Sequence, residues 1–468
     1  MPPSPEYCYP YPVMPREWSK LRSWNGSQEK AFEELCCQLA AAEQMPAGCK
    51  FTRKGTPDAG VECFWTLPNG DEWAWQAKFF FQMQKTQWQD LDDSVQTALA
   101  KHPKMVRYYV CLPIDLADPR LADKKRNRRV KSARDVWDQH VRKWEQWAVR
   151  LGVHVSFEYW GDHQIWLRLA RNEHRGRILF WFNEQWFSDD WLSRRVDEAC
   201  GNAGKRYIPE LHVELELQRA FEALGRTTQF FLRLADLIGG VRREFDRCDI
   251  GRLGGTSVAA SAEQLDKSLH ELMGVLLSTH PPFEPLPFAD ASRLAEQTDR
   301  LALQVATGLR QLDATSDSDP GHSAERYSYE SHHLHSLQDR LADLQQFLDS
   351  PEAVAANTGA LLLVGDAGTG KTHLFCETSR RRAGSSQPTV LFLAEQFVPG
   401  EPWSQMLRIL GLNCDRDELL GALDSIAEAR GTRALILIDA LNEEDGWEIW
   451  PKHLPAMLVE LRNPLLSG

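Results

Sequence analysis

The sequence predicts a multidomain α/β protein with an N-terminal mixed sheet, a helical connector and a C-terminal parallel α/β domain. Three observations indicate this. A length of 468 residues suggests about three domains. Helical and strand-like runs alternate over residues 25–205 and return after 355, whereas 210–350 is rich in Leu, Ala, Glu, Gln and Arg at helical spacing. We therefore expect an irregular lead (1–24), a mixed-sheet domain (25–205), a helical connector (206–350) and a final α/β domain (351–468).

Composition narrows the class of protein. Hydrophobic residues make up 43% and charged residues 26%, which is ordinary for a globular chain and excludes disorder. No apolar run approaches the ~20 residues that span a bilayer, and the Pro- and Tyr-rich start lacks the apolar centre of a signal peptide. We expect a cytoplasmic protein with no membrane partner. The ten cysteines form no C-x-x-C pair, which favours free, mainly buried thiols over a zinc site.

The N-terminal domain is predicted element by element. A helix is expected at 27–44 with Ser27 as N-cap, and strands at 49–55, 61–68 and 72–81. Asn69-Gly70-Asp71 predicts a hairpin between the last two strands. Helices at 86–102 and 131–151 and strands at 105–113 and 153–160 follow, with a further strand suggested at 177–182. Residues 314–323 are expected to be a loop or linker.

A phosphate-binding motif opens the C-terminal domain. Residues 365–372 match G-x-x-x-x-G-K-[ST] in full, and we expect Leu361–Val364 to be a buried strand with a helix starting at Lys371. Backbone N–H groups would hold phosphate, Lys371 would neutralise its charge, and Thr372 would bind Mg²⁺. The expected nucleotide-binding residues are Gly365, Asp366, Ala367, Gly368, Thr369, Gly370, Lys371, Thr372, Asp439 and Glu443.

Two acids downstream support this motif. An apolar run at 434–438 ends in Asp439, the arrangement in which a strand-end acid holds the Mg²⁺ shell. Glu443 lies four residues on and would polarise the attacking water, although a solvated acid is the simpler alternative for it. Both motifs together resemble the STAND class of P-loop NTPases over about residues 355–468. Members of that class continue through a sensor strand, a lid and a winged helix, so the resemblance implies an incomplete NTPase domain and leaves ATP hydrolysis open.

A second constellation lies on the predicted hairpin. Glu62 stands near the start of the first strand, and Gln76 and Lys78 share one face of the second. Phosphodiester hydrolysis needs a divalent metal held by oxygen ligands and a group that orients water. We expect Glu62, Gln76 and the Ala77 carbonyl to hold Mg²⁺, Lys78 to be the catalytic lysine, and Glu33 on the preceding helix to complete the site, with Glu29 and Glu34 as neighbours.

This constellation resembles the PD-(D/E)XK nuclease superfamily in its Mrr-like form, where Q-x-K replaces (D/E)-x-K. Residues 55–62 lie where that group has a Gly-rich approach to the acid, and Asp58 is either a second acid or a turn residue. Over about residues 20–215 the chain is similar to nuclease domains fused to bacterial antiphage STAND NTPases (the AVAST group) and to nucleases of cyclic-oligonucleotide defence systems. The segments that carry this likeness are WQDLDDSVQTALAKHP, YYVCLPIDLADPR, VWDQHVRKWEQWA and KRYIPELHVEL.

Charge and aromatic patterns add weaker expectations. Residues 1–205 hold 30 basic and 27 acidic side chains, whereas the remainder holds 24 and 39. A basic run contacts DNA phosphates in one interpretation and is a solvated loop in the other; its members are Lys124, Lys125, Arg126, Arg128, Arg129, Lys131 and Arg134. Aromatic residues at 65, 73, 75 and 79–81 are expected to pack the hairpin against helices rather than to stack on bases.

The resemblance implies an antiphage effector: a Mg²⁺-dependent endonuclease for double-stranded DNA, controlled by ATP binding and homo-oligomerisation. In full-length relatives a viral protein is the trigger. Two alternatives stay open at this point. One is an ATP-powered restriction endonuclease that translocates on DNA, and the other is a truncated, noncatalytic ATP-binding regulator of a full-length partner.

Overall fold

The computed structural model describes residues 17–54, 60–117, 132–211, 217–277, 284–316, 327–443 and 445–461. The chain is α/β and mostly helical, with one five-stranded mixed sheet and one small parallel sheet. It divides into two compact units, and each is described by itself. Of the described residues, 17–188 and 412–425 form the first unit, and 189–411 and 426–461 form the second. In the described parts of the chain, no helix is both long and apolar enough to span a bilayer.

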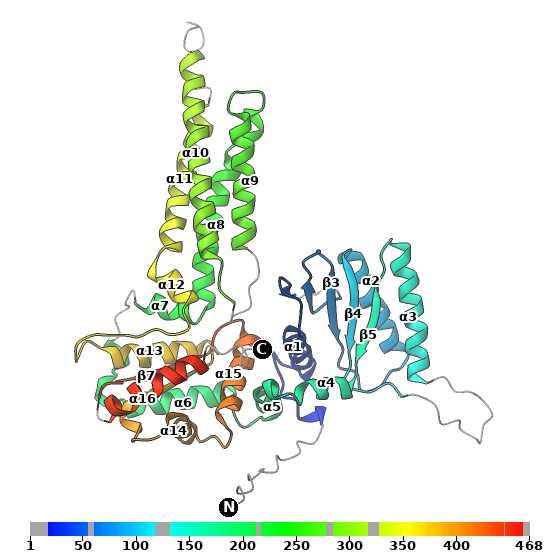
Figure 1. Cartoon of the computed structure of the whole chain (residues 1–468), viewed down its shortest axis with the longest axis vertical. Coiled ribbons are helices and arrows are strands. Elements are labelled where there is room, and N and C mark those ends of the chain that lie inside the picture. Colours follow the sequence, from blue (N-terminus) through cyan, green and yellow to red (C-terminus); the bar gives the residue numbers. More distant parts are fainter. Residues whose placement is uncertain are drawn as a thin grey trace, which may run out of the picture. The chain divides into compact units, whose positions relative to one another are not determined.

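The first unit is built around the five-stranded sheet, in the order β1-β2-β3-β4-β5. β1 to β3 pair antiparallel, and β3 to β5 pair parallel. Helices α2 and α3 cover one face, where Ala74, Tyr108 and Phe157 join the core, and α1 packs against β2 and β3 (Figure 1). The elements are α1 (Gln28–Ala41), β1 (Lys50–Arg53), β2 (Cys63–Thr66), β3 (Glu72–Ala77), α2 (Lys85–Lys101), β4 (Met105–Cys111), α3 (Ala133–Arg150), β5 (Ser156–Trp160), α4 (Asp162–Leu169) and α5 (Arg175–Phe182).

The predicted hairpin is present, and α1 begins after its predicted cap. Gly70 adopts φ +86° in the turn between β2 and β3, a conformation that favours glycine. The Ser27 side chain accepts a hydrogen bond from Lys30 N. The strand suggested at 177–182 is wrong, because these residues form α5, whose Phe180, Trp181 and Phe182 are buried. A six-residue apolar run fits a buried helix turn as well as a strand, so periodicity alone does not separate them.

The second unit combines a helical bundle with the small sheet. Helices α8 to α11 lie side by side around a core of Leu, Val, Ala and Phe side chains (Figure 1). The parallel strands β6 and β7 pack against α13, and α6 packs on β6. The principal elements are α6 (Asp189–Asn202), η3 (Gly204–Arg206), α7 (Leu217–Leu224), α8 (Thr228–Arg247), α9 (Ala259–Leu276), α10 (Phe288–Ser316), α11 (Ser328–Leu348), α12 (Pro351–Asn357), α13 (Lys371–Gly384), β6 (Thr389–Leu393), η6 (Ala394–Gln396), α14 (Pro402–Leu410), α15 (Arg416–Arg430), β7 (Leu435–Asp439) and α16 (Gly446–Glu460).

The boundary between the units falls between Ser188 and Asp189, earlier than the predicted boundary at 205. The reason is packing, because Val196, Ala199 and Cys200 of α6 share a core with Leu374, Leu391 and Leu437. Of the expected linker at 314–323, residues up to Ser316 continue α10, and the remainder lies outside the described residues.

Candidate functional sites

The hairpin brings Glu62 and Gln76 together. Glu62 N donates to Trp75 O at 2.8 Å, so Glu62 continues the β2–β3 ladder and lies beside the end of β3. The Gln76 Nε2 amide donates to Glu62 Oε1 at 2.7 Å and lies 3.5 Å from Ala77 O. Both residues are buried: Glu62 is 9% exposed and Gln76 is 1% exposed. A buried carboxylate therefore faces an amide group and a backbone carbonyl at one strand end.

The Gln76 amide oxygen tests whether this place suits a cation. Gln76 Oε1 is buried and accepts no hydrogen bond from any residue that the structure describes. The two ends of a glutamine amide are assigned from the hydrogen-bond network, and a bound ion would change that network. With the amide reversed, Glu62 Oε1, Ala77 O and Gln76 Oε1 would present three oxygens to one point, which is the donor set that Mg²⁺ prefers. No cluster of three or more His, Cys, Asp or Glu side chains that could hold a metal ion is present among the described residues, so a cation here would be held by one carboxylate together with amide and carbonyl oxygens.

Helix α1 contributes charge near Glu62. Lys30 Nζ donates to Glu33 Oε2 at 2.6 Å, and this bond, together with the nearby charges of Glu33, Glu62 and Glu29, raises the pKa of Lys30 against the opposing effect of burial. Lys30 therefore lies within electrostatic reach of both Glu33 and Glu62. Glu34 has structural partners instead, because it accepts hydrogen bonds from Arg53 and Gln38.

Lys78 directly follows β3. Its backbone N donates to Cys111 O at 3.0 Å, which fixes the main chain at the strand end, and its side chain is half-buried. Within the described ranges, nothing hydrogen-bonds the Lys78 ammonium, whereas Lys30 is engaged by Glu33. Asp58 and basic residues 124–131 lie outside the described residues. Arg134, the last residue of the basic run, lies within the described part of the chain. Its Nε is 3.5 Å from Asp138 Oδ1, and its guanidinium lies over the Tyr159 ring.

Gly60 fixes the segment that enters the Glu62 site. It adopts φ +76°, and a Cβ there would lie 2.3 Å from Ser94 O of α2. Its carbonyl accepts a hydrogen bond of 2.7 Å from the buried Tyr108 hydroxyl. Any other residue at position 60 would strain the backbone and push α2 away, so glycine is required for this close approach.

The Gly-rich turn at 365–370 precedes α13 as predicted. Gly368 and Gly370 adopt φ +78° and +85°, and Lys371 Nζ donates to Gly365 O and Asp366 O at 2.7 Å each. The Lys371 ammonium therefore ties the end of the turn to the two carbonyls at its start. Thr372 Oγ1 donates to Asp439 Oδ2 at 2.6 Å, which brings together the hydroxyl and carboxylate expected to share a Mg²⁺ shell.

The end of β7 carries backbone strain beside this pair. Ala440, directly after Asp439, has φ +58°, which costs free energy in a residue with a Cβ. Its carbonyl accepts a 3.0 Å hydrogen bond from Glu443 N, so the turn brings Glu443 back toward the strand end. Asp439 itself is 2% exposed, whereas the Glu443 side chain is 61% exposed.

The expected buried strand at Leu361–Val364 is wrong. These residues have no regular secondary structure, and Leu362 and Val364 are 69% and 80% exposed. A buried parallel strand needs ladder partners for its N–H and C=O groups. In the described chain β6 and β7 form a two-stranded sheet, and no other strand pairs with β7.

Two polar clusters were not foreseen. Asp92, 2% exposed on α2, accepts hydrogen bonds from His140, Lys143 and Trp144 of α3 at 2.7–2.8 Å. Arg206 of η3 reaches Glu395 at 2.8 Å and Glu443 at 3.9 Å. No local pattern could reveal either one, because the partners lie 51 and 189 residues apart in the sequence for Lys143–Asp92 and Arg206–Glu395.

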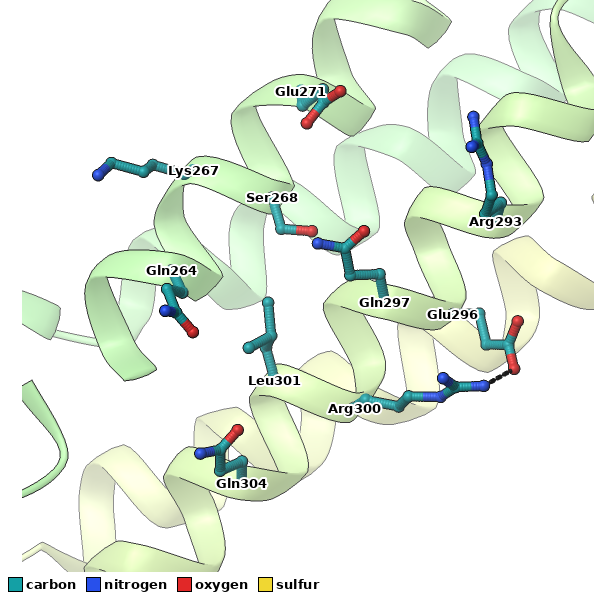
Figure 2. Close-up of a pocket in the computed structure, with 10 residues that line it drawn as sticks. All are labelled: Gln264, Lys267, Ser268, Glu271, Arg293, Glu296, Gln297, Arg300, Leu301 and Gln304. Atoms are coloured by element: carbon teal, nitrogen blue, oxygen red, sulfur yellow. Dashed lines mark hydrogen bonds and ion pairs between the residues drawn. The ribbon is translucent and has the colours of Figure 1, made fainter. Parts of the chain in front are cut away.

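A groove lined by polar side chains lies between α9 and α10, and it is less suited to binding a charged ligand than the two sites described above. Figure 2 shows its lining from the two helices, including Lys267, Arg293 and Arg300. Each of these cations pairs with an acid of its own helix: Glu263, Asp290 and Glu296 respectively. The groove is therefore nearly balanced in charge, and its side chains do not converge on one point.

Comparison with known proteins gives no match: no family model fits the chain, and no curated protein and no solved structure is significantly similar.

Proposed function

We propose that the chain is a metal-dependent DNA endonuclease controlled by an ATP-binding module, of the kind in which a PD-(D/E)XK nuclease domain is fused to a STAND NTPase. The single observation that carries the nuclease is the convergence of Glu62 and Gln76 beside the Ala77 carbonyl, with Gln76 Oε1 left without a hydrogen-bond donor among the described residues. Its role in antiphage defence, with homo-oligomerisation as the activating step, rests on the sequence resemblance alone.

The nuclease chemistry follows from the residues at the end of β3. Glu62, Gln76 and the Ala77 carbonyl would hold a Mg²⁺ ion, which supplies positive charge to polarise a phosphodiester. Lys78, two residues beyond Gln76, would orient the attacking water and stabilise the added negative charge. Glu33, which helix α1 carries, would bind a water molecule of the same metal site. Basic residues near 124–134 would contact the DNA backbone without reading its sequence.

The nucleotide module follows from the turn at 365–370. Backbone N–H groups and Lys371 would bind the phosphates, and Thr372 and Asp439 would hold the nucleotide's Mg²⁺. The hydrogen bond between Thr372 and Asp439 supports this pairing. In this proposal ATP acts as a ligand that favours one state of the protein over another.

A plasmid-nicking assay with Mg²⁺, with and without ATP, tests the nuclease. Lys78→Ala should lower the cleavage rate by about a hundredfold or more, the scale of a positioned proton-transfer or charge-stabilising group. The variant should fold normally, because a half-buried strand-end lysine contributes little packing. Lys85→Ala, an exposed lysine at the start of α2, is the control and should cut like the wild type. Cleavage by Lys78→Ala at the wild-type rate would refute the site.

A further inference from the structure

Three acids gather at the carboxyl edge of the parallel pair β6–β7. Asp439 ends β7 opposite Leu393, the last residue of β6. Glu395 lies in η6, directly after β6, and Glu443 lies in the turn that follows β7. Thr372 reaches the same edge through its hydrogen bond to Asp439. Glu395 and Glu443 therefore lie at the edge where the nucleotide phosphates would bind.

Arg206 stands between two of these acids. Its Nη2 lies 2.8 Å from Glu395 Oε2, and its Nη1 lies 3.9 Å from Glu443 Oε2. The side chains of Arg206, Glu395 and Glu443 are 36%, 38% and 61% exposed. Ion pairs this exposed contribute little to stability because solvent screens them. The guanidinium is consequently held in place but can be released at small cost.

The segment that carries Arg206 is anchored more firmly than the arginine. Tyr207 is buried, and its hydroxyl donates to Glu377 Oε2 of α13 at 2.9 Å. Its ring lies 5.0 Å from the ring of His373, the residue after Thr372. The backbone of η3 is therefore fixed to the helix that starts at Lys371. The Arg206 side chain is held more weakly, by its partly exposed ion pairs and by a long 3.3 Å hydrogen bond from its Nε to Ala203 O.

From this arrangement we infer that Arg206 is a nucleotide-sensing residue, which exchanges Glu395 and Glu443 for the terminal phosphate of ATP. The inference rests on the proposed nucleotide site. A planar guanidinium can make two charge-assisted hydrogen bonds to the oxygens of a phosphate, and a terminal phosphate carries more negative charge than one carboxylate, so it attracts Arg206 more strongly than either acid does. ADP lacks the terminal phosphate, so Arg206 stays with its acids when ADP is bound. Once Arg206 has left Glu443, the Glu443 carboxylate is repelled by the phosphate and can turn toward the solvent.

Binding of a nonhydrolysable ATP analogue and of ADP, each with Mg²⁺, tests this by titration calorimetry on the full chain. Arg206→Ala should weaken analogue binding about tenfold, the scale of one charge-assisted hydrogen bond, and leave ADP binding unchanged. Glu395→Gln should tighten analogue binding, because it removes a competitor for the guanidinium. A purely structural Arg206–Glu395 pair would instead make both variants shift binding in the same direction. Arg194→Ala, an exposed arginine of α6, is the control and should change neither affinity.

The outcomes separate the two proposals. If the wild type binds no nucleotide, or Lys371→Ala binds both as the wild type does, the nucleotide site itself is wrong. If Lys371→Ala loses both nucleotides but Arg206→Ala keeps the wild-type ratio of analogue to ADP affinity, only the sensing role is refuted. Should Arg206→Ala misfold, Arg206→Lys decides, because it keeps the charge and loses the two-pronged geometry; unchanged selectivity in that variant also refutes the role.

Discussion

At the scale of single residues, the Glu62–Gln76 contact makes a prediction that does not depend on cleavage. Gln76→Glu places a second carboxylate against a buried one, which should destabilise the metal-free protein by about 3 kcal/mol. Mg²⁺ should restore most of this, because a cation between two carboxylates offsets their repulsion. Thermal unfolding with and without Mg²⁺ measures both effects.

Gln38 supplies the matched control for Gln76. It is equally buried, on α1, and its amide donates to another glutamate, Glu34, at 3.0 Å. The Gln38 amide also donates to Ser425 O at 2.8 Å, but its own oxygen accepts a hydrogen bond from Trp181 Nε1 at 3.0 Å, and Glu34 is already paired with Arg53. Gln38→Glu should therefore lose comparable stability, but Mg²⁺ should not restore it because Trp181 and Arg53 occupy the oxygens that a cation would need. Equal rescue of both variants, or of neither, would contradict a metal site at Gln76.

The proximity of Glu62 to Gln76 could be predicted because an Asn-Gly hairpin fixes the register of two short strands. The same reasoning could not find Arg206 or the cluster around Asp92. Their partners come from different helices far along the chain, and only tertiary packing brings them together. Lys78 shows a further limit: the pattern predicts a strand over 72–81 that includes it, whereas β3 ends at Ala77, and the direction of its ammonium depends on the site around it.

At the scale of elements, the Asp92 cluster joins α2 to α3 and makes a pH-dependent prediction. Burial raises the pKa of Asp92, but hydrogen bonds from Lys143, His140 and Trp144 outweigh it and hold the pKa below its usual value. A carboxyl group whose folded pKa is lowered stabilises the fold above its unfolded pKa of about 4 and loses that contribution as pH falls through the folded value. Asp92→Asn should cost about 2 kcal/mol at pH 7 and progressively less below about pH 4.

The neighbouring Asp93 is the control for Asp92. It is exposed, and among the residues that the structure describes its carboxylate accepts a hydrogen bond only from Gln89 of its own helix, so Asp93→Asn should change stability by less than about 0.5 kcal/mol. Tryptophan fluorescence during urea unfolding, repeated between pH 7 and about pH 2, gives the comparison, because the loss falls between the unfolded pKa of about 4 and the lower folded pKa. A constant cost of Asp92→Asn over that range would show that its charge does not stabilise the helix pair.

The segment 361–364 shows where element prediction fails. Leu-Leu-Leu-Val before a Gly-rich turn is typical of a buried strand, yet strand formation depends on neighbouring strands as well as on the run itself. Since Val364 is 80% exposed, Val364→Thr should cost less than about 0.5 kcal/mol. Val390→Thr, in buried β6, should cost about 2 kcal/mol because it buries a hydroxyl. Similar losses of melting temperature for both variants would mean that Val364 is packed in a sheet.

At the scale of the whole molecule, the sequence indicates the type of secondary structure in each region better than the number of compact units or their limits. The length suggests about three domains, whereas the described chain divides into two compact units. The alternation of strands and helices predicts the mixed sheet, and helical spacing predicts the bundle. The boundary near 189 could not be predicted, because α6 resembles the other amphipathic helices and only its packing on β6 and α13 assigns it to the second unit.

The division into two units leads to a prediction about independence. Glu62 and Gln76 belong to the first unit, and Lys371, Thr372 and Asp439 belong to the second. Ligands that bind only the folded state stabilise the unit that holds their site. Glu62→Gln should abolish the rise in melting temperature caused by Mg²⁺ alone and keep the rise caused by Mg²⁺ with an ATP analogue, whereas Lys371→Ala should do the reverse. Because the two mutated residues belong to different compact units, the stability losses of the double variant should add within about 0.5 kcal/mol. A loss of the response to Mg²⁺ alone in Lys371→Ala would show instead that the two sites are coupled in the resting protein, before any assembly step.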